Sequence, residues 1–124
     1  RGCSMRRESQ TGPSDRTRYE HMLSAGTAII KFVQGRRRED LETDDMLRRA
    51  LVNAVQEIGE AASRITDAGR ARVPTLPWGQ IVAMRHVLVH VYWGVDNEQL
   101  WNTAANEVPS MLPALEAALA NWDK

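Results

Sequence analysis

A long helical repeat of apolar residues in the middle of the chain constrains the fold more than any other feature. The repeat covers roughly five helical turns and consists of Leu47, Leu51, Ala54, Val55, Ile58, Ala62 and Ile65. Spacing of three or four residues places these side chains on one helix face, which must be buried against other elements. Thr43 followed by Asp44-Asp45 provides a capped, acidic start, and Gly69 is the predicted stop.

Two further helices are predicted on either side of this repeat. The first lies between Ser14 and Gln34, with Ser14 or Asp15 as its cap and Gly35 as its end. Residues 70–75 form a linker, and a third helix is predicted from about Pro77 to Tyr92, since proline suits a first helical position. Apolar and polar residues do not alternate across 85–91, so a strand is not favoured there.

A fourth helix is predicted after Asp96, which caps it, with Gln99 at the capping-box position. Pro109 and Pro113 interrupt the pattern and predict a kink or a short fifth helix. The chain therefore predicts an all-α bundle of four to five helices. We expect one domain over residues 14–124, preceded by a disordered tail or leftover segment at 1–13.

Charge and cysteine content exclude several classes of protein. Sixteen Lys and Arg balance sixteen Asp and Glu, so bulk attraction cannot hold a nucleic acid, although a small basic cleft can. Cys3 is the only cysteine, which excludes a disulfide framework. The apolar stretches are far shorter than the ~18 residues of a membrane span. We expect a soluble, cytoplasmic protein without a membrane partner.

The segment Arg85–Tyr92 gathers chemically capable side chains on one predicted helix. His86 and His90 are four residues apart, as in helical zinc sites, but Val87 stands where a zinc protease has its glutamate. No third ligand is evident nearby. A metal site is therefore the weaker interpretation, and we expect neither a metal nor another cofactor.

Cleavage of RNA without a metal is the second interpretation of this segment. The ribose 2′-hydroxyl is the nucleophile, so a histidine such as His90 can move the proton and Arg85 can stabilise charge on the phosphate. These two residues are about 140° apart around a helix, so two copies of the helix would build a fuller cleft. The residue types leave open a purely structural role, with one of His86 and His90 capping a helix, the other packing, and Arg85 in a salt bridge.

The order Arg85, four residues, His90, one residue, Tyr92 resembles that of the HepT-like toxins of the HEPN superfamily. The flanks resemble the family as well: Leu76-Pro77-Trp78 and Ile81–Met84 before the motif, Gly94–Asp96 and Leu100-Trp101 after it, and Ile58–Ala62 in the second helix. The resemblance spans roughly residues 19–122. Two positions depart from the superfamily pattern: His86 stands where many members have asparagine, and Val91 where many have glycine.

The resemblance implies a four-to-five-helix bundle that dimerises through the motif-bearing helices. It also implies a metal-independent ribonuclease toxin, with Arg85 and His90 at a composite site and His86 in a supporting position. The partner would be a minimal nucleotidyltransferase antitoxin that adenylylates Tyr92. Added bulk and negative charge there would block entry of the RNA phosphate.

Two other functions remain open at this stage. The same helix suits a non-catalytic module that docks a nucleotidyltransferase and contributes to its substrate or nucleotide site. A structural dimer with no site is the third alternative. The basic run Arg36–Arg38 is expected to be a solvated helix end, with an RNA path as its alternative. Because the net charge is zero, RNA binding should depend on a small local footprint and only weakly on salt.

Overall fold

The computed structural model describes residues 14–86 and 96–124, and these consist of helices and connecting turns without a strand. The predicted tail at 1–13 and the part of the motif at 87–95 lie outside the described residues. The elements in chain order are α2 (Asp15–Val33), α3 (Asp40–Thr43), α4 (Asp45–Ser63), α5 (Asp67–Arg70), α6 (Trp78–Ala83), the 3₁₀ turn η1 (Met84–His86), α8 (Asn97–Asn102), the π-helical stretch η2 (Thr103–Glu107) and α9 (Val108–Ala120).

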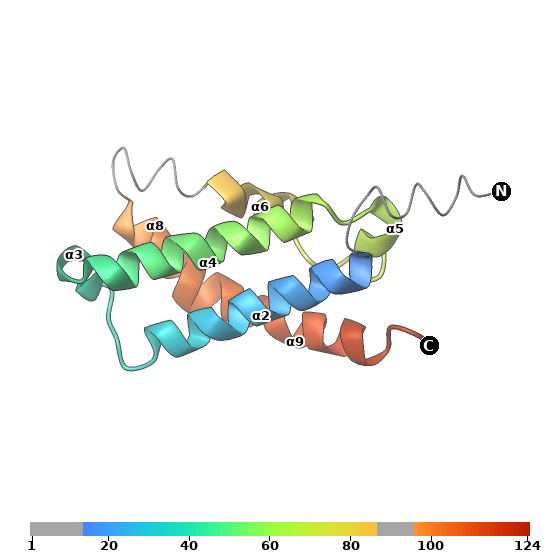
Figure 1. The fold of residues 1–124 in the computed structure, drawn as a ribbon, viewed down its shortest axis with the longest axis horizontal. Coiled ribbons are helices and arrows are strands. Elements are labelled where there is room, and N and C mark those ends of the chain that lie inside the picture. The colour runs from blue at the N-terminus through green and yellow to red at the C-terminus, as the bar shows by residue number, and fades with distance from the viewer. Residues whose placement is uncertain (1–13, 87–95) are drawn as a thin grey trace.

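Helix α4 lies at the centre of the bundle and contributes more buried core residues than any other described element. It runs antiparallel to α2, and α6 with η1 packs on its other side, while α9 packs against α2 (Figure 1). The predicted stripe is confirmed: Leu51, Val55 and Ile58 are completely buried. The expected all-α bundle is therefore confirmed within the described chain. In that part, no helix combines the length and the apolar character needed to span a membrane.

Side-chain caps start the helices at the predicted residue or, for α4, one residue after the predicted Thr43. Ser14 caps α2 by accepting the backbone N–H of Thr17, and Asp44 caps α4 by accepting that of Leu47. Asp96 caps α8 in the same way. After α2 the chain turns at Gly35, whose φ of 73° lies in the left-handed region that favours glycine.

The predicted end of the long helix at Gly69 is wrong. Helix α4 ends at Ser63, and a separate short helix, α5, follows it. Thr66 begins the new helix, because its hydroxyl accepts the backbone N–H of Gly69 and caps it. The carboxylate of Asp15 in turn accepts hydrogen bonds from the backbone N–H and the hydroxyl of Thr66, which fixes the turn against α2.

A π-helical stretch precedes the two prolines of the last helix. Residues 103–107 form η2, and α9 follows directly, with Pro109 in its first turn. The missing N–H of proline is tolerated at that position. Pro113 lies inside α9 on its exposed side and does not end the helix, so it is not the interruption that the sequence predicts.

Tyr19 of α2 contacts three later parts of the chain, namely α5, the start of α6 and the segment after α9. Its ring is completely buried and packs edge-on against Trp78 and Trp122, with ring centroids 5.9 and 5.0 Å away. The hydroxyl donates a hydrogen bond of 2.7 Å to the carbonyl of Gly69. Burial raises the pKa of the Tyr19 phenol, so the group remains a neutral donor.

Candidate functional site

The structure places the first two motif residues on a tight turn and leaves the others outside the described chain. Arg85 and His86 lie on η1, which continues α6 with a 3₁₀ turn. Arg85 is half-buried and His86 is exposed. His90 and Tyr92 fall within 87–95, so their predicted roles remain predictions.

Gly59 of α4 allows the Arg85 turn to approach unusually closely. A Cβ atom at Gly59 would lie 2.2 Å from the backbone nitrogen of Arg85 and 2.8 Å from the carbonyl carbon of Met84. Only a residue without a side chain fits that contact. The sequence signal for it is a glycine inside a buried helical repeat, which is otherwise unfavourable for a helix.

The guanidinium group of Arg85 has no protein partner among the described residues. Its Nε atom is buried and forms no hydrogen bond, and none of the described ion pairs includes Arg85. A buried donor without an acceptor costs stability, and a phosphate oxygen bound there would supply the acceptor. The salt bridge that a structural role for Arg85 requires is therefore not found in the described chain.

The basic run Arg36–Arg38 differs from Arg85 in this respect. Arg36 pairs with Asp40 at 3.3 Å and with Asp44 at 2.6 Å, which joins the turn after α2 to the start of α4. Arg38 pairs with Glu42 and, across to α8, with Glu98. These carboxylates already balance the two guanidinium groups, so the structure gives no support for an RNA path along them.

The hydrogen bond from Arg36 also changes the acidity of its partners. The Arg36 side chain holds the pKa of Asp44 below its usual value, and the backbone N–H of Leu47 adds to that effect. The pKa of Asp40 is lowered chiefly by the backbone N–H of Arg37, with Arg36 contributing further. Both carboxylates therefore stay charged at any pH at which RNA cleavage would be assayed.

A pocket lies beside the motif turn. It has a volume of about 400 Å³ and is lined by Val55, Gln80, Ala83, Met84, His86, Gln99, Thr103 and Glu107. A second pocket of about 350 Å³ continues it along α9 and shares Gln80, Met84 and Glu107 with it. Among these residues the sequence named only His86 as a candidate site residue, because the others come together through the packing of α4, α6 and η1 near α8 and η2.

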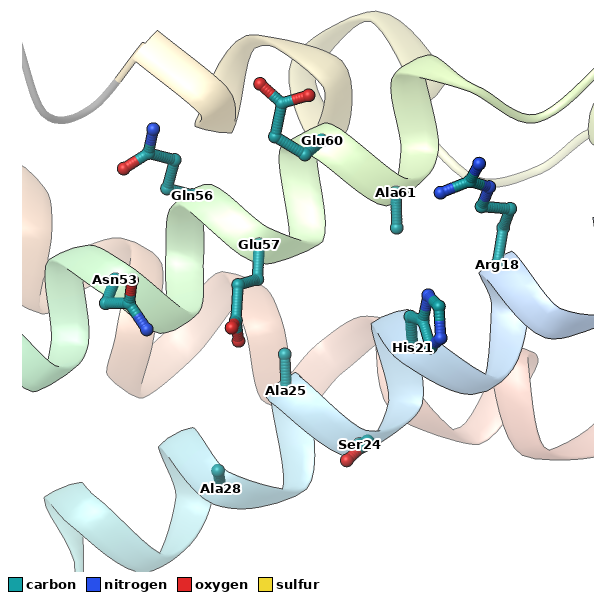
Figure 2. A pocket seen from close by; sticks show the side chains of 10 residues that line it. All are labelled: Arg18, His21, Ser24, Ala25, Ala28, Asn53, Gln56, Glu57, Glu60 and Ala61. Atoms are coloured by element: carbon teal, nitrogen blue, oxygen red, sulfur yellow. The ribbon is translucent and has the colours of Figure 1, made fainter. Parts of the chain in front are cut away.

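A larger groove runs between α2 and α4, and neither Arg85 nor His86 lines it. It has a volume of about 620 Å³, a floor of Ala25, Ala28 and Ala61, and a polar rim that includes Arg18, His21 and Glu57. Figure 2 shows Arg18 and His21 extending from α2 toward α4, with Glu57 reaching back from α4. In the described chain, no three His, Cys, Asp or Glu side chains form a group that could hold a metal ion.

Comparison with known proteins gives one consistent result. The model of the family described as "Ribonuclease HepT-like" matches residues 22–118. The "Putative RNase TTE0752" of Caldanaerobacter subterraneus subsp. tengcongensis is 35% identical over 92 residues, which is 74% of this chain and 82% of that protein. The "Putative RNase MJ1380" of Methanocaldococcus jannaschii is 30% identical, over 77% of this chain and 87% of its own. The "Probable ribonuclease HepT" of Thermococcus cleftensis is 33% identical, over 74% and 84%. No solved structure matches the chain significantly.

Proposed function

Because this chain belongs to the HepT-like ribonuclease family, we propose that it cleaves RNA without a metal ion, at a site that two copies of the chain build together. Family membership identifies it as an endoribonuclease, the enzyme class that the sequence predicts. The observation that supports this site most directly is the Arg85 guanidinium, which has no carboxylate partner among the described residues. A guanidinium group without a carboxylate partner can donate its hydrogen bonds to a phosphate.

The proposed reaction uses the nucleophile that RNA carries. The 2′-hydroxyl oxygen attacks the adjacent phosphorus and passes its proton to His90, while Arg85 stabilises the negative charge that develops on the phosphate oxygens. The bond from phosphorus to the 5′-oxygen then breaks, and that oxygen takes up the proton that His90 has accepted. The products are a 2′,3′-cyclic phosphate and a 5′-hydroxyl end. The proton transfers and the charge stabilisation are supplied by protein side chains alone.

The spacing of the two residues in the sequence supports a site shared by two chains. Arg85 and His90 are five residues apart, and five residues span about 140° around an ideal helix and ~7.5 Å along it. A single such helix would present the two side chains on different sides. Two such helices related by a two-fold axis would bring the Arg85 of one copy and the His90 of the other to a common cleft.

We further propose that this ribonuclease is a toxin silenced by a minimal nucleotidyltransferase that adenylylates Tyr92. An adenylate two residues from His90 would fill the cleft and repel the RNA phosphate. The test is the intact mass of the protein after production with a cognate nucleotidyltransferase. The expected result is one added adenylate, which is absent from a Tyr92→Phe variant. An unchanged mass of the wild type would contradict this regulation and leave the cleavage proposal intact.

Cleavage assays in EDTA test the proposed activity itself. The wild type should cut RNA, whereas Arg85→Ala and His90→Ala should each lose at least about a hundredfold in rate, as losses of transition-state stabilisers and of general bases do. The matched control is Arg64→Ala, because Arg64 is an exposed arginine at the end of α4 whose contact with Glu60 is long, at 3.9 Å.

Two outcomes would contradict the proposed activity. Equal cleavage by the wild type and both variants would remove Arg85 and His90 from the mechanism. An inert wild type that binds a nucleotidyltransferase and shows no toxicity alone would instead favour the non-catalytic module.

A further inference from the structure

We propose that the pocket beside His86 is a nucleobase subsite, and that it selects guanine at a position next to the cleaved phosphate. This inference rests on the proposed ribonuclease function, which it deepens by naming the feature of the RNA that the enzyme reads. The pocket has a volume of about 400 Å³, near the lower end of the ~300–1,000 Å³ of small-molecule sites. It is lined by His86, which is next to Arg85 in the sequence, so a base held there would lie close to a phosphate that Arg85 contacts.

Two irregular helical stretches meet at this pocket. One wall is the 3₁₀ turn η1, from which Met84 and His86 line it. The opposite wall is the π-helical stretch η2, and its first and last residues, Thr103 and Glu107, both line the pocket. π-Helical turns are rare and occur frequently at functional sites, because they redirect side chains that a regular helix would place elsewhere. Here Glu107, the last residue of the π-helical stretch, lines the same pocket as His86.

The Glu107 carboxylate is held in place and still has acceptor capacity. One oxygen accepts from the Thr103 hydroxyl at 3.4 Å, and the other accepts from the Asn102 amide at 3.2 Å. A carboxylate has about four lone-pair positions. None of the ion pairs in the described chain includes Glu107. Its two oxygens are therefore free to accept two further N–H groups from a ligand.

Guanine is the base that fits this acceptor best. Its Watson–Crick edge carries two neighbouring donors, N1–H and the N2 amino group, which match the two oxygens of one carboxylate. Uracil has a single N–H between two carbonyl oxygens, and those oxygens would be repelled by Glu107. Adenine and cytosine each offer one amino group, so their pairing with Glu107 should be weaker than that of guanine and stronger than that of uracil. Reading of unpaired bases along this edge is typical of sequence-specific RNA recognition.

The remaining lining suits the rest of a base. The amides of Gln80 and Gln99 form no hydrogen bonds with described residues, so both can pair with the base edge or with the sugar. Val55 and Met84 supply apolar contacts for the ring. The exposed imidazole of His86 can stack on its face, as histidine does in other RNA-binding proteins. This gives His86 a role in holding substrate.

The first test compares cleavage of RNA oligonucleotides that differ only in the base at one position. The wild type should prefer guanine over uracil by about tenfold or more, which is the discrimination expected from one bidentate pair. Glu107→Gln keeps the size of the side chain and should reduce that preference to about twofold. Gln99→Ala should weaken it as well. The matched control is Glu57→Gln, on the α2–α4 groove, which should retain the wild-type preference.

The second test measures binding without cleavage, using oligonucleotides in which 2′-fluorine replaces every 2′-hydroxyl. Fluorescence anisotropy should show tighter binding of the guanine oligonucleotide by the wild type, and Glu107→Gln should abolish the difference. Cleavage with a base preference that Glu107→Gln leaves unchanged would overturn the subsite and leave the ribonuclease proposal standing. If the wild type does not cleave, equal binding of the four oligonucleotides overturns the subsite, and guanine-selective binding lost in Glu107→Gln supports it.

Discussion

The position of Arg85 depends on one residue that has no side chain. The Arg85 turn lies against α4 at Gly59, where any Cβ atom would overlap the turn's own backbone. Backbone atoms cannot swing away as a side chain can, so a larger residue must push the whole turn outward. The geometry of the candidate site therefore depends on the core helix beneath it.

Gly59→Ala should accordingly lower both stability and RNA cleavage. We expect a loss of about 1–3 kcal/mol in the free energy of unfolding from overpacking, and a lower cleavage rate because Arg85 is displaced. Gly79→Ala is the control, since no atom lies within 4 Å of a Cβ at that position. It should be neutral or stabilise by up to about 1 kcal/mol through helix propensity. Urea unfolding measures the change in stability, and RNA cleavage assays measure the change in activity. A Gly59→Ala variant that behaves like Gly79→Ala would contradict the close contact between Gly59 and the Arg85 backbone.

The buried hydroxyl of Tyr19 supports a second prediction about a single residue. Tyr19→Phe keeps the ring contacts with Trp78 and Trp122 but leaves the carbonyl of Gly69 without its donor at 2.7 Å. The free energy of unfolding should fall by about 1–3 kcal/mol, the cost of an unsatisfied buried polar group. His21→Ala, at an exposed position on the same helix, should change it by less than about 0.5 kcal/mol. Equal melting temperatures for wild type and Tyr19→Phe would argue against this hydrogen bond.

Among the elements, long helices and their caps could be predicted from the sequence, and short or irregular elements could not. The stripe through Leu51 and Ile58 and the caps Ser14, Asp44 and Asp96 follow from local rules of spacing and capping. The turn at Thr66 depends on Asp15, which is about fifty residues earlier in the chain, so no local pattern shows it. The π-helical stretch before Pro109 likewise has no periodic sequence pattern of its own.

The ion pair between Arg36, after α2, and Asp44, before α4, should make stability depend on pH in the acid range. Asp44 has a lowered pKa chiefly because Arg36 donates a hydrogen bond to it. The ion pair therefore stabilises the fold above the ordinary carboxyl pKa of 3.8, and this stabilisation is lost as the pH falls through the lowered pKa. Arg36→Gln should therefore lower the melting temperature at pH 6 and make little difference at a pH well below 3.8. Arg37→Gln, at an exposed neighbouring position, is the control. An equal loss of melting temperature in Arg36→Gln at both pH values would show that the ion pair does not cause the loss.

For the molecule as a whole, the sequence predicted the all-α bundle and the motif, and packing determined the rest of the site. The pocket beside His86 brings together residues from 55 to 107 on five separate elements, a combination that no spacing within one helix indicates. The zero net charge fits a chain in which carboxylates balance Arg36 and Arg38 while Arg85 stays without a described partner. RNA recognition should then be local, with a weak dependence on salt.

Because α4 lies at the centre of the core, substitutions of its buried side chains should lower stability far more than a substitution on its exposed side. Leu51→Ala and Ile58→Ala remove side chains that are completely buried, and each should cost about 2–5 kcal/mol of unfolding free energy by leaving a cavity. Met46→Ala, on a side chain that is 77% exposed, should cost less than about 0.5 kcal/mol. Urea titration followed by circular dichroism measures all three. Small losses at Leu51 and Ile58 would show that α4 is not the centre of the core.

The central claim is that one copy's Arg85 works with the other copy's His90. The most direct measurement is RNA cleavage in EDTA by a dimer with one Arg85→Ala chain and one His90→Ala chain, purified through two different tags. Such a dimer keeps one intact pair across the interface and no intact pair within a chain. We predict that it cleaves RNA while both parent variants remain inactive, and a mixed dimer as inactive as its parents would contradict the account.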